Sequence, residues 1–133
     1  MNWYKKAFGE PNLIKPLVDK LVAQFPGLDL DVWDNAKLGY IHISSIRLPK
    51  NMRGQGIGTT IMKAIQNYAQ SVGRPVTLSP QPEPRHKKDL YDFYKRLGFI
   101  RNRGRHTDYR LSDMFGPSMY WKPPKTNTTS DAP

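Results

Sequence analysis

The chain has 133 residues, no cysteine and a formal net charge of +10. This length corresponds to one domain, and the absence of thiols excludes disulfides, thiolate metal sites and a cysteine nucleophile. The three histidines are widely spaced, so no metal is expected. No apolar segment is long enough to span a bilayer, and the first residues do not resemble a signal peptide. We therefore expect a soluble, cytoplasmic protein without a membrane partner.

The first part of the chain predicts a helix followed by two strands. Apolar residues between 12 and 25 fall on one helical face, and Pro16 is tolerated in a first turn because amides there have no helical acceptor. Residues 28–33 alternate apolar and acidic side chains, as in a half-buried strand. Residues 34–35 are expected to form a turn, and a second strand covers 38–48.

The apolar pattern changes parity within this second strand. Ile41 and Ile43 share one face, whereas Ile46 and Leu48 fall on the opposite parity. One extra residue near Ser44-Ser45 would return both pairs to the same face. The sequence therefore predicts a β-bulge at this point.

The rest of the chain completes a mixed α/β domain over residues 1–122. The polar residues 123–133 are expected to form a disordered tail. The remaining predicted elements are a helix over 59–72, a short buried strand over 75–78, a loop over 80–84, a helix over 88–97, a strand from 99, a basic loop or irregular hairpin over 101–110 and a strand over 119–121.

A glycine-rich loop lies between the bulged strand and the next helix. Glycines let the backbone approach a ligand closely, and the first amides of a helix attract anions. No lysine follows the last glycine, which excludes a P-loop, and the glycine spacing differs from the dinucleotide fingerprint. The loop is thus predicted to bind phosphate, but it belongs to neither of these two nucleotide-binding classes. Its residues are Arg53, Gly54, Gln55, Gly56, Ile57, Gly58 and Thr59.

This loop resembles the donor loop of the GNAT superfamily of N-acetyltransferases. The family signature, Arg/Gln-x-x-Gly-x-Gly/Ala, is matched by Arg53, Gly56 and Gly58. A second family feature, a tyrosine four residues before Gly-Phe, is matched by Tyr94. The resemblance covers roughly residues 38–100 and implies a GNAT-like mixed central sheet with a bulged strand and flanking helices.

The resemblance implies direct transfer of an acetyl group from acetyl-coenzyme A to an amine of a protein or a small molecule. Tyr94 would protonate the departing thiolate; packing in the core is the alternative role. Backbone amides of the bulged strand would hold the pantetheine arm, and the glycine loop would hold the pyrophosphate. The implied donor contacts outside the loop are Ile46, Arg47 and Leu48.

The general base is less clearly marked. No acidic residue lies between positions 34 and 83, although family members often use one on the central strands. His42 is one candidate, because histidine titrates near neutral pH; a structural histidine is the alternative. Glu83 is the other, with a solvated loop carboxylate as its alternative. A water could also be ordered by Ser44, Ser45 and Ser79.

Basic residues are concentrated between Arg85 and Arg110. They are either a solvated face that partly serves the 3′-phosphate of coenzyme A or a groove for nucleic acid or an acidic macromolecule. Two alternatives to an amine acetyltransferase therefore stay open. One is a GNAT-fold acyltransferase that modifies nucleic acid or a protein bound to it, and the other is a non-catalytic GNAT-like domain that binds nucleic acid or protein.

Overall fold

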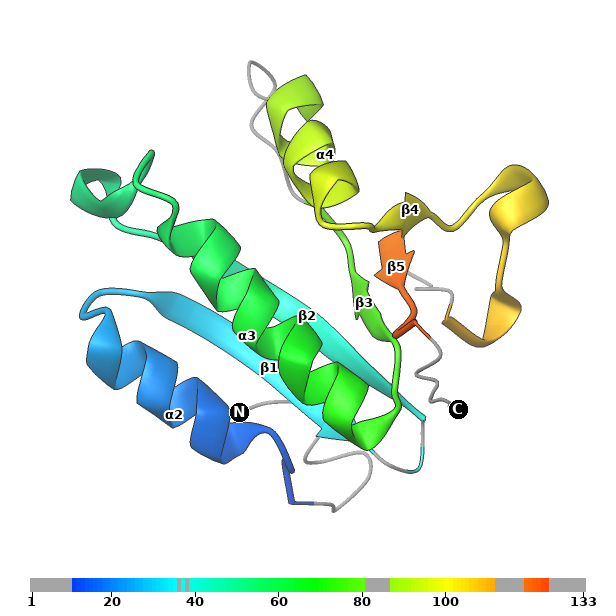
Figure 1. Ribbon diagram of the computed structural model, residues 1–133, viewed down its shortest axis with the longest axis horizontal. Coiled ribbons are helices and arrows are strands. Elements are labelled where there is room, and N and C mark those ends of the chain that lie inside the picture. The colour runs from blue at the N-terminus through cyan, green and yellow to red at the C-terminus, as the bar shows by residue number, and fades with distance from the viewer. Residues whose placement is uncertain (1–10, 36, 38, 81–86, 112–118, 125–133) are drawn as a thin grey trace, which may run out of the picture.

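The computed structural model describes residues 11–35, 37, 39–80, 87–111 and 119–124. Its core is a five-stranded mixed sheet with the strand order β1-β2-β3-β5-β4, and helices flank it (Figure 1). Glu83, Arg85, His86 and nearly all of the predicted tail lie outside the described residues. The described helices and strands are α2 (Lys15–Gln24), β1 (Asp29–Asn35), β2 (Tyr40–Arg47), α3 (Ile57–Val72), β3 (Val76–Leu78), α4 (Lys87–Arg96), β4 (Ile100–Arg101) and β5 (Met119–Trp121).

The order and type of these elements confirm the predicted mixed α/β fold. Pro16 lies in the first turn of α2, where its missing amide costs no helical hydrogen bond. At the far end, Phe25 caps the helix by donating its amide to Leu21 O at 2.9 Å. Leu21 is buried against the same core as the inward residues of β1, so α2 covers this part of the sheet.

The register of β1 and β2 confirms the predicted β-bulge. Asp31 pairs with Ser45, but the next residue, Val32, pairs with Ile43, so Ser44 is the extra residue. Beyond the bulge, Ile46 packs against the same core as Ile43. One inserted residue thus restores the apolar face of β2.

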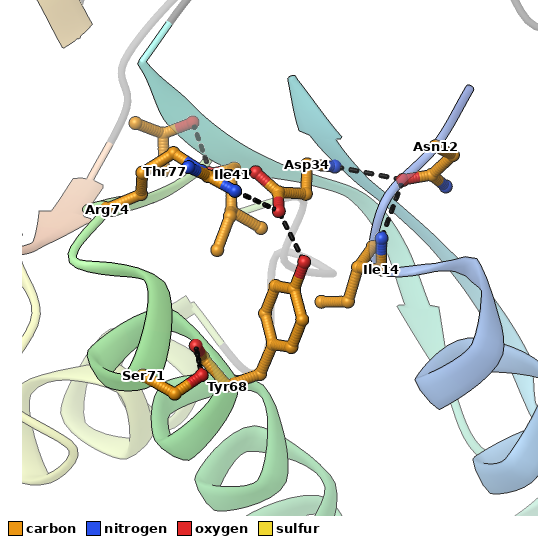
Figure 2. Close-up of polar contacts among 8 residues, drawn as sticks. All are labelled: Asn12, Ile14, Asp34, Ile41, Tyr68, Ser71, Arg74 and Thr77. Carbon is orange, nitrogen blue, oxygen red and sulfur yellow. Dashed lines mark hydrogen bonds and ion pairs between the residues drawn. The ribbon is translucent and has the colours of Figure 1, made fainter. Parts of the chain in front are cut away.

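The turn predicted at residues 34–35 is wrong, because both residues belong to β1. The Asp34 side chain is fully buried. It accepts hydrogen bonds from Arg74 Nε and Nη2, both at 2.6 Å, and from the Tyr68 hydroxyl at 2.5 Å (Figure 2). An aspartate in an exposed turn would be hydrogen-bonded to water. Here the three side-chain donors take the place of that water, so the carboxylate can lie inside the domain.

Helices α3 and α4 pack close to one another. The side-chain amide of Gln66 in α3 donates to Leu97 O, just after α4, at 2.8 Å. Gly73 ends α3 with φ of 70°, and its amide returns to the carbonyls of Ala69 and Gln70. After α4, the chain enters the short strand β4, which pairs with β5 in antiparallel orientation.

Candidate active site

A cleft opens where β2 and β3 separate. The parallel ladder between them has three residue pairs, from Ile41–Val76 to Ile43–Leu78. The bulge at Ser44 then turns β2, and Pro80 cannot donate a ladder hydrogen bond on the other side. The resulting cleft has a volume of about 460 Å³. Its lining residues are Ile43, Ser44, Ser45, Ile46, Arg47, Leu78, Ser79, Pro80, Leu90 and Tyr94.

The walls of this cleft include exposed main chain. Beyond Ile43, β2 keeps its pairing with β1 but has no residue pair with β3. Backbone amides and carbonyls on that side of β2 are therefore available to an extended ligand that enters between the strands. Ile46 and Arg47, which the resemblance assigned to donor binding, line this stretch.

The glycine loop leads directly into α3. Gly54 and Gly56 have φ of 76° and 75°, in the left-handed region where side chains with a Cβ are disfavoured. Gly56 is the N-cap of α3 and has no side-chain cap. The first helical hydrogen bond runs from Thr60 N to Gly56 O at 3.1 Å. The amides of residues 57–59 therefore have no helical acceptor and can bind an anion.

Positive charge surrounds this helix end. The Arg53 side chain is exposed, and its Nε donates to Leu48 O at 3.0 Å, which fixes the guanidinium beside the loop. Its remaining N–H groups are donors of the kind that bind phosphate. Lys50 and Arg47, which are close in sequence to this contact, are also exposed. The loop thus combines free amides, the helix dipole and full charges.

Gly58, the last glycine of the loop, packs close to residues that neighbour the cleft lining in sequence. A Cβ atom added there would lie 3.5 Å from the Phe93 ring and 3.9 Å from Leu48 Cδ1. Phe93 precedes Tyr94, and Leu48 follows Arg47; Tyr94 and Arg47 both line the cleft. The start of α3 therefore lies next to α4 and to the residue that follows β2.

Tyr94 lies on the α4 side of the cleft and is only 5% exposed. Its ring packs edge-on against Phe93 and Phe99, with centroids 5.2 and 5.8 Å away. Burial raises the pKa of the Tyr94 hydroxyl to about 12. The phenol is therefore protonated at neutral pH, which suits a proton donor.

The other two catalytic candidates are placed differently. His42 is not among the residues that line the cleft; its Nδ1 lies 2.8 Å from Thr77 Oγ1, on the neighbouring strand. Glu83 lies outside the described residues. Of the two candidates that the structure describes, Tyr94 lines the cleft and His42 does not.

A carboxylate that the sequence did not mark lies beside the cleft. Ser45 lines the cleft, and its hydroxyl donates to Asp29 Oδ2 at 3.1 Å. Asp29 is exposed and comes from β1, so no local motif joins it to the site. The predicted bulge was the one sequence signal that could have revealed this contact. It sets the register of β1 and β2, which brings Ser45 close to the start of β1.

The described part of the chain holds no group of three histidine or carboxylate side chains that could bind a metal ion. Nor does any helix among those residues have the length and apolar character needed to cross a membrane.

This region thus combines separated parallel strands, a glycine loop at a helix N-terminus and a buried tyrosine. The chain matches the model of the GNAT acetyltransferase family over residues 14–99. It therefore belongs to the GNAT acetyltransferase family. No curated protein sequence matches the chain significantly.

Two solved structures share the fold. One is the anti-CRISPR protein AcrVA5, with 23% identity and a TM-score of 0.51 over 72% of this chain and 90% of that chain. The other is GCN5 from Tetrahymena, with 12% identity and a TM-score of 0.55 over 86% of this chain and 91% of that chain. At identities this low, the structural similarity shows a common architecture alone. The acceptor has to be inferred from this chain's own residues.

Proposed function

We propose that the protein is an N-acetyltransferase that transfers the acetyl group of acetyl-coenzyme A to an amine of a protein or a small molecule. The catalytic domain is assigned to residues 1–122. The observation that carries the proposal is the packing of the loop residue Gly58 against Phe93 and Leu48, the sequence neighbours of Tyr94 and Arg47 in the cleft. Family membership supports the same reaction.

Donor binding is assigned to main-chain groups. The amides of residues 57–59 and the Arg53 guanidinium hold the pyrophosphate. The edge of β2 from Ile46 to Leu48 pairs with the amides of the pantetheine arm. Glycines at 54 and 56 keep the loop in the left-handed conformation that this contact needs. The binding energy thus comes mainly from groups whose position is set by the fold.

Tyr94 is assigned as the acid. When bound, the donor supplies a thioester carbonyl carbon that the amine nitrogen attacks; the new C–N bond forms, the C–S bond breaks and the thiolate leaves. The Tyr94 hydroxyl gives its proton to that sulfur. It has no hydrogen bond to another described residue, so the leaving group would be its partner in the site.

Asp29 and Ser45 are assigned to the proton that the amine loses. Ser45 takes this proton, directly or through a water, and passes its own to the Asp29 carboxylate, which bulk solvent then discharges. The motivating observation is the 3.1 Å hydrogen bond from the cleft-lining serine to Asp29. His42 lies behind this pair in the ladder with Thr77, and it is assigned a structural role.

The first experiment is isothermal titration of the protein with acetyl-coenzyme A, alongside dephospho-coenzyme A and adenosine. Micromolar, saturable binding of acetyl-coenzyme A and loss of binding for adenosine are expected. A protein that binds none of the three would remove the donor assignment. Mass spectrometry of a lysine-containing peptide library incubated with the donor then tests transfer, since each acetylation adds one acetyl mass to a product.

A further inference from the structure

The segment 102–111 between β4 and β5 is an ordered projection, named here the basic arm. Figure 1 shows it as the yellow excursion that extends away from the sheet beyond β4. Two short 3-10 turns, Gly104–His106 and Tyr109–Leu111, shape it. Asn102 braces it by donating Nδ2 to Asp108 O at 2.9 Å and accepting from Asp108 N at 2.8 Å.

The arm is also anchored to the sheet. The Tyr120 hydroxyl, on β5, donates to His106 O at 2.6 Å, and Leu111 is buried. Within the arm, Thr107 Oγ1 donates to Gly104 O at 2.8 Å. These contacts hold the backbone of the arm without using its arginines. The arginines are therefore presented on a pre-organised support.

The charge of the arm is poorly balanced. Asp108 is its one carboxylate, and it is already engaged by Lys122 at 3.0 Å and by Arg110 at 3.5 Å. Arg103 and Arg105 are exposed and have no ion pair with a described residue. Arg101, just before the arm, differs, because its guanidinium stacks 3.9 Å from the Tyr91 ring centroid. The free positive charge is thus concentrated at the outer part of the arm.

The basic arm also carries an exposed aromatic ring. Tyr109 is 87% exposed. Its ring therefore contributes little to the stability of the fold, because a tyrosine stabilises a protein mainly when its ring is buried. The neighbouring Arg110 side chain is also 87% exposed. An accessible ring on the same short segment as three exposed arginines matches the two requirements of single-stranded nucleic acid, namely charge for phosphates and a flat face for bases.

We propose that the basic arm binds single-stranded nucleic acid through Arg103, Arg105 and Arg110, with a base stacked on Tyr109. An acidic protein would be attracted by the same arginines, but it would gain little from a protruding aromatic ring. This binding site is separate from the donor cleft, whose lining contains none of the arm residues. The inference is therefore independent of the proposed transferase reaction.

The test is fluorescence anisotropy with labelled 20-nucleotide single strands of mixed sequence, one of RNA and one of DNA, measured from 50 to 300 mM salt. Each phosphate contact contributes roughly −0.7 to the slope of log affinity against log salt. The double variant Arg103→Gln/Arg105→Gln should lose about 1.4 of this slope. A matched control, Lys20→Gln/Lys63→Gln, removes equal charge from exposed positions on α2 and α3 and should keep the slope.

Tyr109 supplies the second readout. Tyr109→Ala should weaken binding at least about fivefold, whereas Tyr109→Phe should keep it, because stacking needs only the ring. Both changes leave folding intact at so exposed a position. Equal loss in the lysine control, unchanged binding in Tyr109→Ala, or displacement of the strand by acetyl-coenzyme A would each overturn the proposal. The tighter of the two probes identifies RNA or DNA as the partner.

Discussion

The backbone of Gly58 lies against the ring of Phe93, so that an added Cβ would be 3.5 Å from that ring. Gly58 belongs to the anion-binding end of α3, and Phe93 precedes Tyr94 on α4. The glycine loop and the helix that carries Tyr94 are therefore in close contact. Variants on the loop side of this contact test donor binding, and variants on the α4 side test turnover.

Replacement of Gly56 by glutamate should abolish binding of acetyl-coenzyme A. The new carboxylate would occupy the anion site, and φ of 75° would add backbone strain of about 1 kcal/mol. Gly73→Glu is the matched control, because Gly73 has φ of 70°, lies at the opposite end of the same helix and also has open space around it. Both variants should lose similar stability in urea unfolding. Retained donor affinity in Gly56→Glu would contradict the assigned site.

Replacement of Tyr94 by phenylalanine should lower turnover by about 10² or more while donor affinity stays nearly constant. The ring and its packing are kept, and only the proton donor is removed. Steady-state kinetics should therefore show a loss in kcat with little change in KM. If turnover of the variant equals that of the unaltered protein, Tyr94 is a packing residue.

Stability should decline as the solution becomes strongly alkaline. Burial raises the pKa of Tyr94 from its usual value of 10.0 to about 12, and that of Tyr68 also to about 12 with help from Asp34. Above pH 10 the unfolded chain loses these protons before the folded chain does, so the free energy of unfolding falls between pH 10 and 12. In Tyr94→Phe, the fall in the free energy of unfolding between pH 10 and 12 should be smaller by on the order of 2 kcal/mol. An identical pH profile for the variant would show that the hydroxyl is solvated.

Replacement of Asp29 by asparagine should slow transfer by at least about tenfold at neutral pH, because the proton of the amine loses its acceptor. The loss should shrink at higher pH, where the amine arrives unprotonated. Asp31→Asn is the control, since it changes the same charge two residues along the same strand. A similar loss in both variants would indicate a general electrostatic effect and would remove the relay.

Replacement of Asp34 by alanine should destabilise the protein by about 3–5 kcal/mol, because it leaves Arg74 without its buried partner. The control is Asp19→Ala, which breaks an ion pair with Lys15 of similar length, 2.7 Å, on the surface of α2. That pair should contribute no more than about 0.5 kcal/mol. Chemical unfolding measures both values. A small effect at Asp34 would show that water replaces the carboxylate.

Features of the site that depend on local pattern could be predicted from the sequence. The parity change between Ile43 and Ile46 predicted the bulge that the structure contains, and the glycine pattern placed the loop between the bulged strand and the next helix. Both follow from rules that operate within a few residues, namely period two in a strand and glycine where a backbone needs freedom.

Features that depend on distant partners could not be predicted in this way. Asp34 was taken for a turn residue because nothing near it in sequence announces Arg74 or Tyr68. The hydrogen bond from Ser45 to Asp29 could not be predicted for the same reason, since the two residues lie on separate strands. Hydrogen bonds between separate elements are set by the fold as a whole, and a single sequence does not show which polar residues will meet.

The anion-binding groups that we propose for the glycine loop belong to the main chain, and this has an evolutionary consequence. Point mutations change side chains, so most of them would leave such a site intact as long as the glycines at 54 and 56 are retained. Selection on such a site would act on few positions, and the surfaces that face an acceptor would be free to diverge. In keeping with this, the chain shares its architecture with a protein of 12% identity.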